Sequence, residues 1–178
     1  MKFLFALILI SNSVIAEKVK NIPQSLMVEN IEYSLCKEYT VRYAFVVKIA
    51  YVGLYLKDCS TDENLLKLSD KLIRFNYQVN VKEKFFIDAA EEFFIKNLHQ
   101  AGNTNNIQEL NRFNQYYEDI ESSDFYDLYH QQGQKLKLSK NNKLLGVSND
   151  VNFGYKYFNI WFGDEPAIKP LKKAFIDK

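Results

Sequence analysis

The sequence contains few of the residues that interrupt a fold or bind a metal. Its 178 residues include six glycines, three prolines, two cysteines and two histidines. Because the glycines and prolines are scattered, no linker or low-complexity segment divides the chain. His99 and His130 stand in no ligand-like spacing with either cysteine, so we expect no metal site. Phosphate-loop, dinucleotide-binding, zinc-protease and serine-hydrolase motifs are also missing, and no cofactor is expected.

The sequence also lacks an excess of charge, with 23 basic and 22 acidic residues. A balanced chain gives no electrostatic reason to expect a nucleic acid or an anionic membrane as its partner.

No apolar run is long enough to cross a membrane, which takes roughly 20 residues. The run from Phe3 to Ile10 follows the single charge of Lys2 and precedes a polar stretch and a small residue, Ala16. This order is typical of a secretory signal peptide that is cleaved after Ala16. We therefore expect residues 1–16 to be removed on export and residues 17–178 to form a single domain with no membrane span.

The two cysteines, Cys36 and Cys59, leave their pairing open. Export makes a disulfide chemically possible. A bridge requires Cα atoms within about 7 Å of each other, which the sequence does not establish. A disulfide and two independent thiols both remain possible at this point.

The pattern of apolar residues predicts strands first. Residues 40–57 are apolar at both alternating sets of positions, which is typical of one long central strand covered on both faces. Residues 72–79 alternate between apolar and polar side chains and predict a half-buried strand.

Helices and further strands follow. Asn80 and Glu83 form a capping box before a helix that carries apolar residues at helical spacing as far as Leu98. We expect a second helix over 107–120, strands over 125–139 and 143–147 with a turn at 140–142, and two C-terminal helices, the last one starting near Pro170. This order predicts an α+β sheet with helices packed on it.

Three stretches together resemble the chalcone isomerase-like family. They are Arg42 to Leu56, with Lys48-Ile-Ala-Tyr-Val-Gly-Leu-Tyr, then Val81-Lys-Glu-Lys-Phe-Phe86, and Phe158-Asn-Ile-Trp-Phe-Gly-Asp-Glu-Pro166. With the signal peptide, the chain is similar to exported bacterial members of that family. The resemblance implies an antiparallel sheet with helices packed on one side, a cleft between them for a planar or fatty ligand, and a periplasmic location.

The resemblance also places the catalytic positions of the plant enzymes, which cyclise chalcones. They fall at Ala50, near Val81, near Asp88 and at Ile160, and three of these four side chains carry no polar hydrogen. Loss of a single oxyanion donor typically costs on the order of 10²–10³ in rate. No catalytic residue is therefore assigned.

The ligand-binding residues implied by the resemblance are Arg42, Lys48, Ala50, Asp88 and Ile160. Arg42 and Lys48 lie six residues apart, so in one strand they would share a face with Ala50. On that apolar face each cation needs a partner, either a structural carboxylate or a ligand carboxylate. The sequence thus favours a non-catalytic protein that binds a small amphipathic or fatty-acid-like ligand. The alternatives are an isomerase or intramolecular lyase acting on an unsaturated carbonyl compound, and an interaction module with a filled cleft.

Overall fold

The computed structural model describes residues 22–61, 63–68, 70–98 and 104–176. The expected signal peptide and His99 lie outside these residues. No helix among the described residues is long and apolar enough to cross a bilayer.

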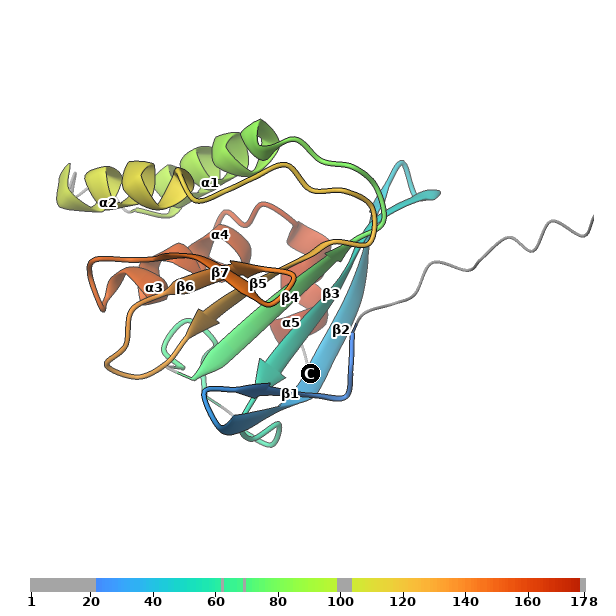
Figure 1. The fold of residues 1–178 in the computed structure, drawn as a ribbon, viewed down its shortest axis with the longest axis horizontal. Helices are drawn as coiled ribbons and strands as arrows, with labels where there is room; N and C mark the ends of the chain where they lie inside the picture. The colour runs from blue at the N-terminus through green and yellow to red at the C-terminus, as the bar shows by residue number, and fades with distance from the viewer. Residues whose placement is uncertain (1–21, 62, 69, 99–103, 177–178) are drawn as a thin grey trace, which may run out of the picture.

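Seven strands form one sheet in which each strand pairs with its neighbours in chain order, always antiparallel (Figure 1). Their bounds are β1 Ser25–Val28, β2 Ile31–Tyr43, β3 Val47–Leu56, β4 Lys71–Tyr77, β5 Phe125–His130, β6 Lys137–Lys140 and β7 Lys143–Val147. This arrangement confirms the predicted α+β class.

The predicted long strand over 40–57 is wrong. β2 ends at Tyr43, a turn follows, and β3 starts at Val47. Ala44 and Phe45 have positive φ angles of 47° and 65°. Because neither residue is a Gly, Asn or Asp, the usual sequence signal for a hairpin turn is missing here.

Two further strand predictions need correction. The expected strand over 125–139 is interrupted between β5 and β6, where Gly133 adopts a positive φ of 66°. β4 is buried along its whole length rather than on one face only. The predicted turn between β6 and β7 is confirmed at Asn141 and Asn142.

β4 is buried on both faces because the sheet curls over itself. Its helix-facing side, called the inner face here, packs against the helices. On the outer face, β1 and the start of β2 fold back toward β5, so that Tyr33 contacts Tyr129 edge to face with their hydroxyls 3.1 Å apart. Ile22, Tyr55 and Leu72 complete this second apolar cluster.

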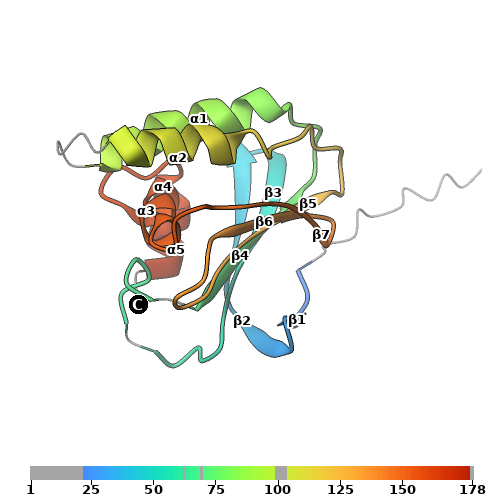
Figure 2. The same ribbon diagram turned by 60° about the vertical axis from the view of Figure 1, so that its left-hand side comes forward.

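The helices are α1 Glu83–Asn97, α2 Thr104–Asn114, α3 Phe153–Tyr157, α4 Asn159–Phe162 and α5 Lys169–Ile176. Figure 2 shows α1 and α2 side by side above the sheet, and the buried residues of the helices join one core with its inner face. Helices on one side of the sheet are therefore confirmed.

The predicted capping box at the start of α1 is wrong. The Asn80 carboxamide oxygen accepts from the backbone N–H of Ser122 instead. The N–H of Glu83 donates to Asp119, which lies 36 residues further along the chain, and Lys82 forms an ion pair with the same carboxylate. A tertiary contact thus caps the helix.

The disulfide that the sequence left open is formed in the structure. Cys36 of β2 and Cys59, in the loop after β3, have Cα atoms 5.1 Å apart. β2 and β3 are neighbouring strands, and their pairing brings the two cysteines together.

Candidate functional site

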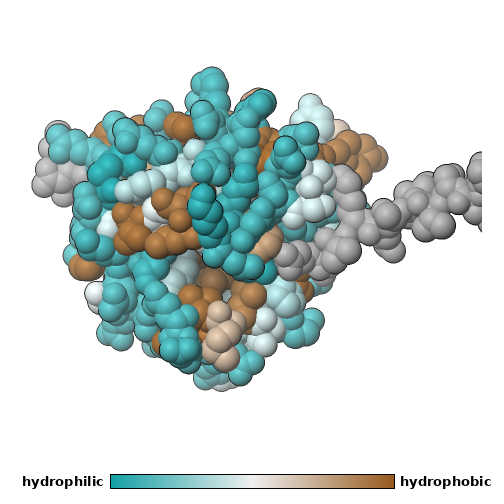
Figure 3. All heavy atoms as spheres, in the orientation of Figure 1, coloured by the Kyte–Doolittle hydropathy of each residue, from teal (hydrophilic) through white to brown (hydrophobic). Residues whose placement is uncertain are grey.

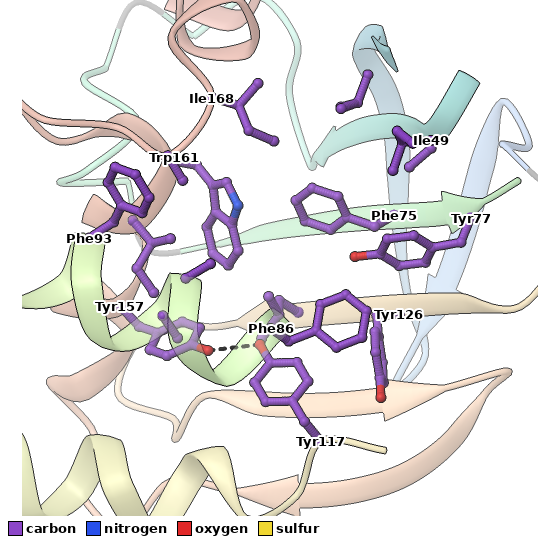
Figure 4. Close-up of a pocket in the computed structure, with 17 residues that line it drawn as sticks. Ile49, Phe75, Tyr77, Phe86, Phe93, Tyr117, Tyr126, Tyr157, Trp161 and Ile168 are labelled. Atoms are coloured by element: carbon purple, nitrogen blue, oxygen red, sulfur yellow. Dashed lines mark hydrogen bonds between the residues drawn. The ribbon is translucent and has the colours of Figure 1, made fainter. Parts of the chain in front are cut away.

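A cavity of about 250 Å³ lies between the inner face of the sheet and α1. Its walls come from the ends of β2, β3, β4 and β5, from α1, and from the chain around α3, α4 and the segment before α5 (Figure 4). The lining residues are Val41, Ile49, Ala50, Phe75, Tyr77, Phe86, Ala89, Ala90, Phe93, Tyr117, Tyr126, Leu128, Tyr157, Ile160, Trp161, Ala167 and Ile168. None of these side chains is charged, so the cavity suits an apolar molecule.

Two local features of the sequence create this space. α1 presents the small side chains of Ala89 and Ala90 to the sheet, between the larger Phe86 and Phe93. The pairing of β2 with β3 also shifts by one residue between Val41 and Arg42. A bulge at that point turns two successive residues, Ile49 and Ala50, toward the same side.

The mouth of the cavity is marked by lining residues that are only half buried. Ile49 lies at the base of the β2–β3 hairpin, Ala89 lies on α1, and Ile168 precedes α5. Phe75 and Trp161, with ring centroids 5.4 Å apart, lie deeper between the sheet and α4. A ligand would therefore enter between the hairpin base, α1 and the segment before α5.

The polar groups at the cavity wall are phenolic hydroxyls and the indole N–H of Trp161 (Figure 4). Tyr117 and Tyr157 share a hydrogen bond of 2.7 Å, and the hydroxyl of Tyr126 is bonded to both the N–H and the carbonyl of Glu118. The hydroxyl of Tyr77 points into the cavity and forms no hydrogen bond with another described residue (Figure 4). Tyr77 is only 9% exposed. A hydroxyl that opens into the cavity can donate to a ligand bound there or accept from it.

Burial also sets the ionisation state of these phenols. It raises the pKa of Tyr77 and of Tyr117 well above the usual value, because the charged phenolate would lose its hydration. Both phenols are therefore neutral near pH 7. They can donate a hydrogen bond to a ligand but provide no positive charge.

Some of the ligand-binding residues expected from the sequence line the cavity, and others lie away from it. Ala50 and Ile160 both line the cavity. Asp88 lies on the exposed side of α1, where it forms an ion pair with Lys84. Among the residues that the structure describes, no carboxylate lines the cavity wall.

Arg42 and Lys48 do not line the cavity, and their expected position on the same face as Ala50 is wrong. They belong to different strands and are direct cross-strand partners at the exposed end of the hairpin. Lys48 donates to the hydroxyl of Tyr51, which packs against the outer-face cluster. The bulge reverses the alternation between Lys48 and Ala50, because a one-residue shift moves a side chain to the opposite face.

The four tyrosines of the cavity were missed by sequence analysis. The alternation over 72–79 did place Tyr77 on the same face as Ile73 and Phe75. Tyr77 lines the same cavity as Tyr117 and Tyr157 only because the later segments fold back over the sheet. Within the described ranges, no group of three or more His, Cys, Asp or Glu side chains is placed to hold a metal ion.

Comparisons with known proteins agree with this geometry. The family model for chalcone isomerase-like proteins matches residues 16–176. The chain belongs to the chalcone isomerase-like family. No curated protein matches this chain in sequence. Among solved structures, it is similar to the crystal structure of an Arabidopsis thaliana fatty-acid binding protein, with 14% identity and a TM-score of 0.61 over 86% of this chain and 96% of the other. At this identity the likeness shows the fold alone.

Proposed function

We propose that this chalcone isomerase-like protein binds a small amphipathic, fatty-acid-like ligand in the cavity between α1 and the sheet and does not convert it. The observation that carries the proposal is an uncharged, largely apolar cavity into which the Tyr77 hydroxyl points without a hydrogen bond to any described residue. Its volume of about 250 Å³ lies near the lower end of known small-molecule sites, roughly 300–1,000 Å³, so the ligand is short or extends out of the mouth. The fatty-acid binding protein of similar fold supports this ligand class.

The polar end of the buried ligand is uncharged in this proposal. Burying a carboxylate without a partner costs far more than burying a hydroxyl, and no cation of the described segments lines the cavity. Tyr77 offers both a donor and an acceptor. An alcohol, an aldehyde or a protonated carboxyl group meets it at low cost, whereas a carboxylate stays in the water at the mouth.

The wall residues also support binding without catalysis. Ala50 and Ile160, which stand at catalytic positions of the plant enzymes by resemblance, line the cavity with apolar side chains. Neither can orient a water molecule or stabilise an enolate oxygen. A saturable conversion of a chalcone by the purified protein would favour the isomerase alternative.

Titration with alkyl alcohols and carboxylates of matched length, from hexyl to dodecyl, tests the proposal. Binding can be followed by calorimetry or by displacement of an apolar fluorescent probe. We expect saturable binding that is tighter for each alcohol than for its carboxylate at neutral pH. Absence of saturable binding by any member of either series would overturn the proposal.

Two pairs of variants locate the ligand. Ala89→Phe should block the cavity, while Glu91→Phe adds the same ring to the exposed side of α1 and serves as the control. Tyr77→Phe should weaken alcohol binding about 2- to 10-fold, the value of one neutral hydrogen bond. Tyr126→Phe is its control, since the Tyr126 hydroxyl is already bonded to the backbone of Glu118.

We further infer that the protein is exported to a periplasm after cleavage at Ala16. The basic and apolar leader and the disulfide between Cys36 and Cys59, a bond typical of oxidising compartments, support this location. Intact mass of the periplasmic product should correspond to a chain starting at Glu17. A full-length product confined to the cytoplasm would contradict export.

A further inference from the structure

The turn between β2 and β3 carries an apolar surface, called the hairpin tip here, made of residues 43–47. Phe45 is 94% exposed, Val46 75%, Tyr43 71% and Val47 43%. Figure 1 shows this hairpin projecting beyond the rest of the sheet, and its end appears brown in the space-filling view of Figure 3. Single exposed apolar residues are common on protein surfaces, but a contiguous exposed group marks an interaction site.

The backbone of the hairpin tip is unfavourable for the residues that occupy it. The N–H of Val46 donates to the carbonyl of Tyr43, and both central residues, Ala44 and Phe45, are left-handed. Left-handed turns of this kind favour Asn and Gly, and a bulky residue there is strained. The β6–β7 turn of the same chain has the same pair of positive φ angles and uses Asn141 and Asn142.

The two residues just below the tip are cations. Arg42 and Lys48 are exposed cross-strand partners, and no acidic residue occurs from Tyr39 to Tyr51. Each cation is three positions from Phe45 in the chain, which places the charges at most roughly 10 Å below the tip at a strand rise of about 3.4 Å per residue. Apolar groups that enter a bilayer interface reach ~5–10 Å, with basic residues at the level of anionic headgroups.

We propose that the hairpin tip inserts into the interface of an anionic lipid bilayer, with Arg42 and Lys48 binding the headgroups. The phenol of Tyr43 is suited to the headgroup level, where amphipathic rings collect. A protein partner fits less well, because a stable protein interface needs about 800 Å² on each side and the tip is one narrow turn. The balanced charge of the whole chain conceals this local concentration of cations.

Insertion would bring the cavity mouth close to the bilayer. Val41 and Ile49, which line the cavity, are the direct neighbours of Arg42 and Lys48 in the two strands. The proposal does not depend on ligand binding, and a variant with an altered cavity, Tyr77→Phe, should bind vesicles like the unchanged protein. Failure of this proposal and failure of the proposed function are therefore distinguishable.

Flotation with vesicles tests the proposal, using phosphatidylcholine alone and phosphatidylcholine mixed equally with phosphatidylglycerol. Because residues 3–10 are themselves apolar, all variants are compared with the same N-terminus, established by intact mass. We expect binding to the mixed vesicles, little binding to phosphatidylcholine alone, and weaker binding as salt is raised. The double variant Arg42→Gln with Lys48→Gln should bind about fivefold more weakly for each cation removed.

Phe45→Asn is the most informative variant, because it removes the exposed ring while placing at the turn the residue used at position 142. We expect its vesicle binding to fall at least tenfold with no loss of thermal stability. Phe85→Asn, which removes an exposed ring from α1, should bind like the unchanged protein. Equal binding of the Phe45→Asn variant, or a dimer in sedimentation that this variant abolishes, would overturn the proposal.

Discussion

Arg74 and Asp127 face each other across β4 and β5 and form two parallel hydrogen bonds of 2.7 Å each. Both side chains are buried, and the guanidinium carbon lies 4.0 Å from the centroid of the Phe125 ring. The two parallel hydrogen bonds pair the buried guanidinium with the buried carboxylate, so neither charge lacks a partner. This pair explains how β4 can carry a charged residue while buried on both faces.

Removal of one partner of this pair should be severely destabilising. Asp127→Ala leaves the Arg74 guanidinium buried without its counter-charge, and we expect the free energy of unfolding to fall by about 3–5 kcal/mol. Urea unfolding measures it. The double replacement Arg74→Met with Asp127→Leu should recover most of that loss, since an apolar pair of similar volume leaves no charge unpaired. A loss below about 1 kcal/mol for Asp127→Ala would contradict the pair's assigned role.

The disulfide should contribute measurably to stability. Cys36 and Cys59 are separated by 23 positions, and closing a loop of this length lowers the entropy of the unfolded chain by an amount worth about 3 kcal/mol. Urea unfolding with and without reductant should show the difference. The double variant Cys36→Ser with Cys59→Ser is the control and should be insensitive to reductant. Equal stability of the oxidised and reduced protein would show that the bond adds nothing.

Lys71 should make stability depend on pH. It is fully buried, its ammonium donates to the carbonyl of Leu68 and lies 4.7 Å from the Phe158 ring centroid, and burial lowers its pKa to about 7. In the unfolded chain its pKa is about 10.4, so the unfolded state binds more protons than the folded state between these values. The free energy of unfolding should therefore rise with pH over this range, by at most about 1.4 kcal/mol per pH unit.

Urea unfolding between about pH 7 and 9, below the range in which ordinary tyrosines ionise, isolates this contribution. Lys71→Met keeps an unbranched side chain and should remove the slope. If the two proteins show parallel profiles, another group is responsible for the dependence.

Arg42 should have little influence on ligand binding. Because it is exposed and does not line the cavity, Arg42→Ala should leave ligand affinity unchanged within about twofold and stability within ±0.5 kcal/mol. The same displacement assay and a thermal melt measure both. Ala50→Leu, which enlarges a residue of the cavity wall, should weaken binding and serves as the comparison. A tenfold loss for Arg42→Ala would show that this cation reaches the ligand at the mouth.

Local patterns in the sequence were sufficient to predict the fold class and several helices, strands and turns. The helical spacing after Glu83, the turn at Asn141 and Asn142 and the last helix from Lys169 all depend on residues close together in the chain. Three short stretches were also enough for the family, which the match over residues 16–176 confirms. The cavity lies between sheet and helices, where the family resemblance implied a cleft, and Ala50 and Ile160 are among the residues that line it.

The tertiary structure alone decided the rest of the site. The turn at Ala44 and Phe45 carries none of the usual turn residues, so the sequence indicated one strand where there are two. The bulge next to Val41 then placed Arg42 and Lys48 outside and Ile49 inside. The cap on α1 from Asp119, the buried polar side of β4 and the open hydroxyl of Tyr77 depend on segments far apart in the chain. Periodicity describes one element at a time, whereas burial and partners are set by the elements that pack against it.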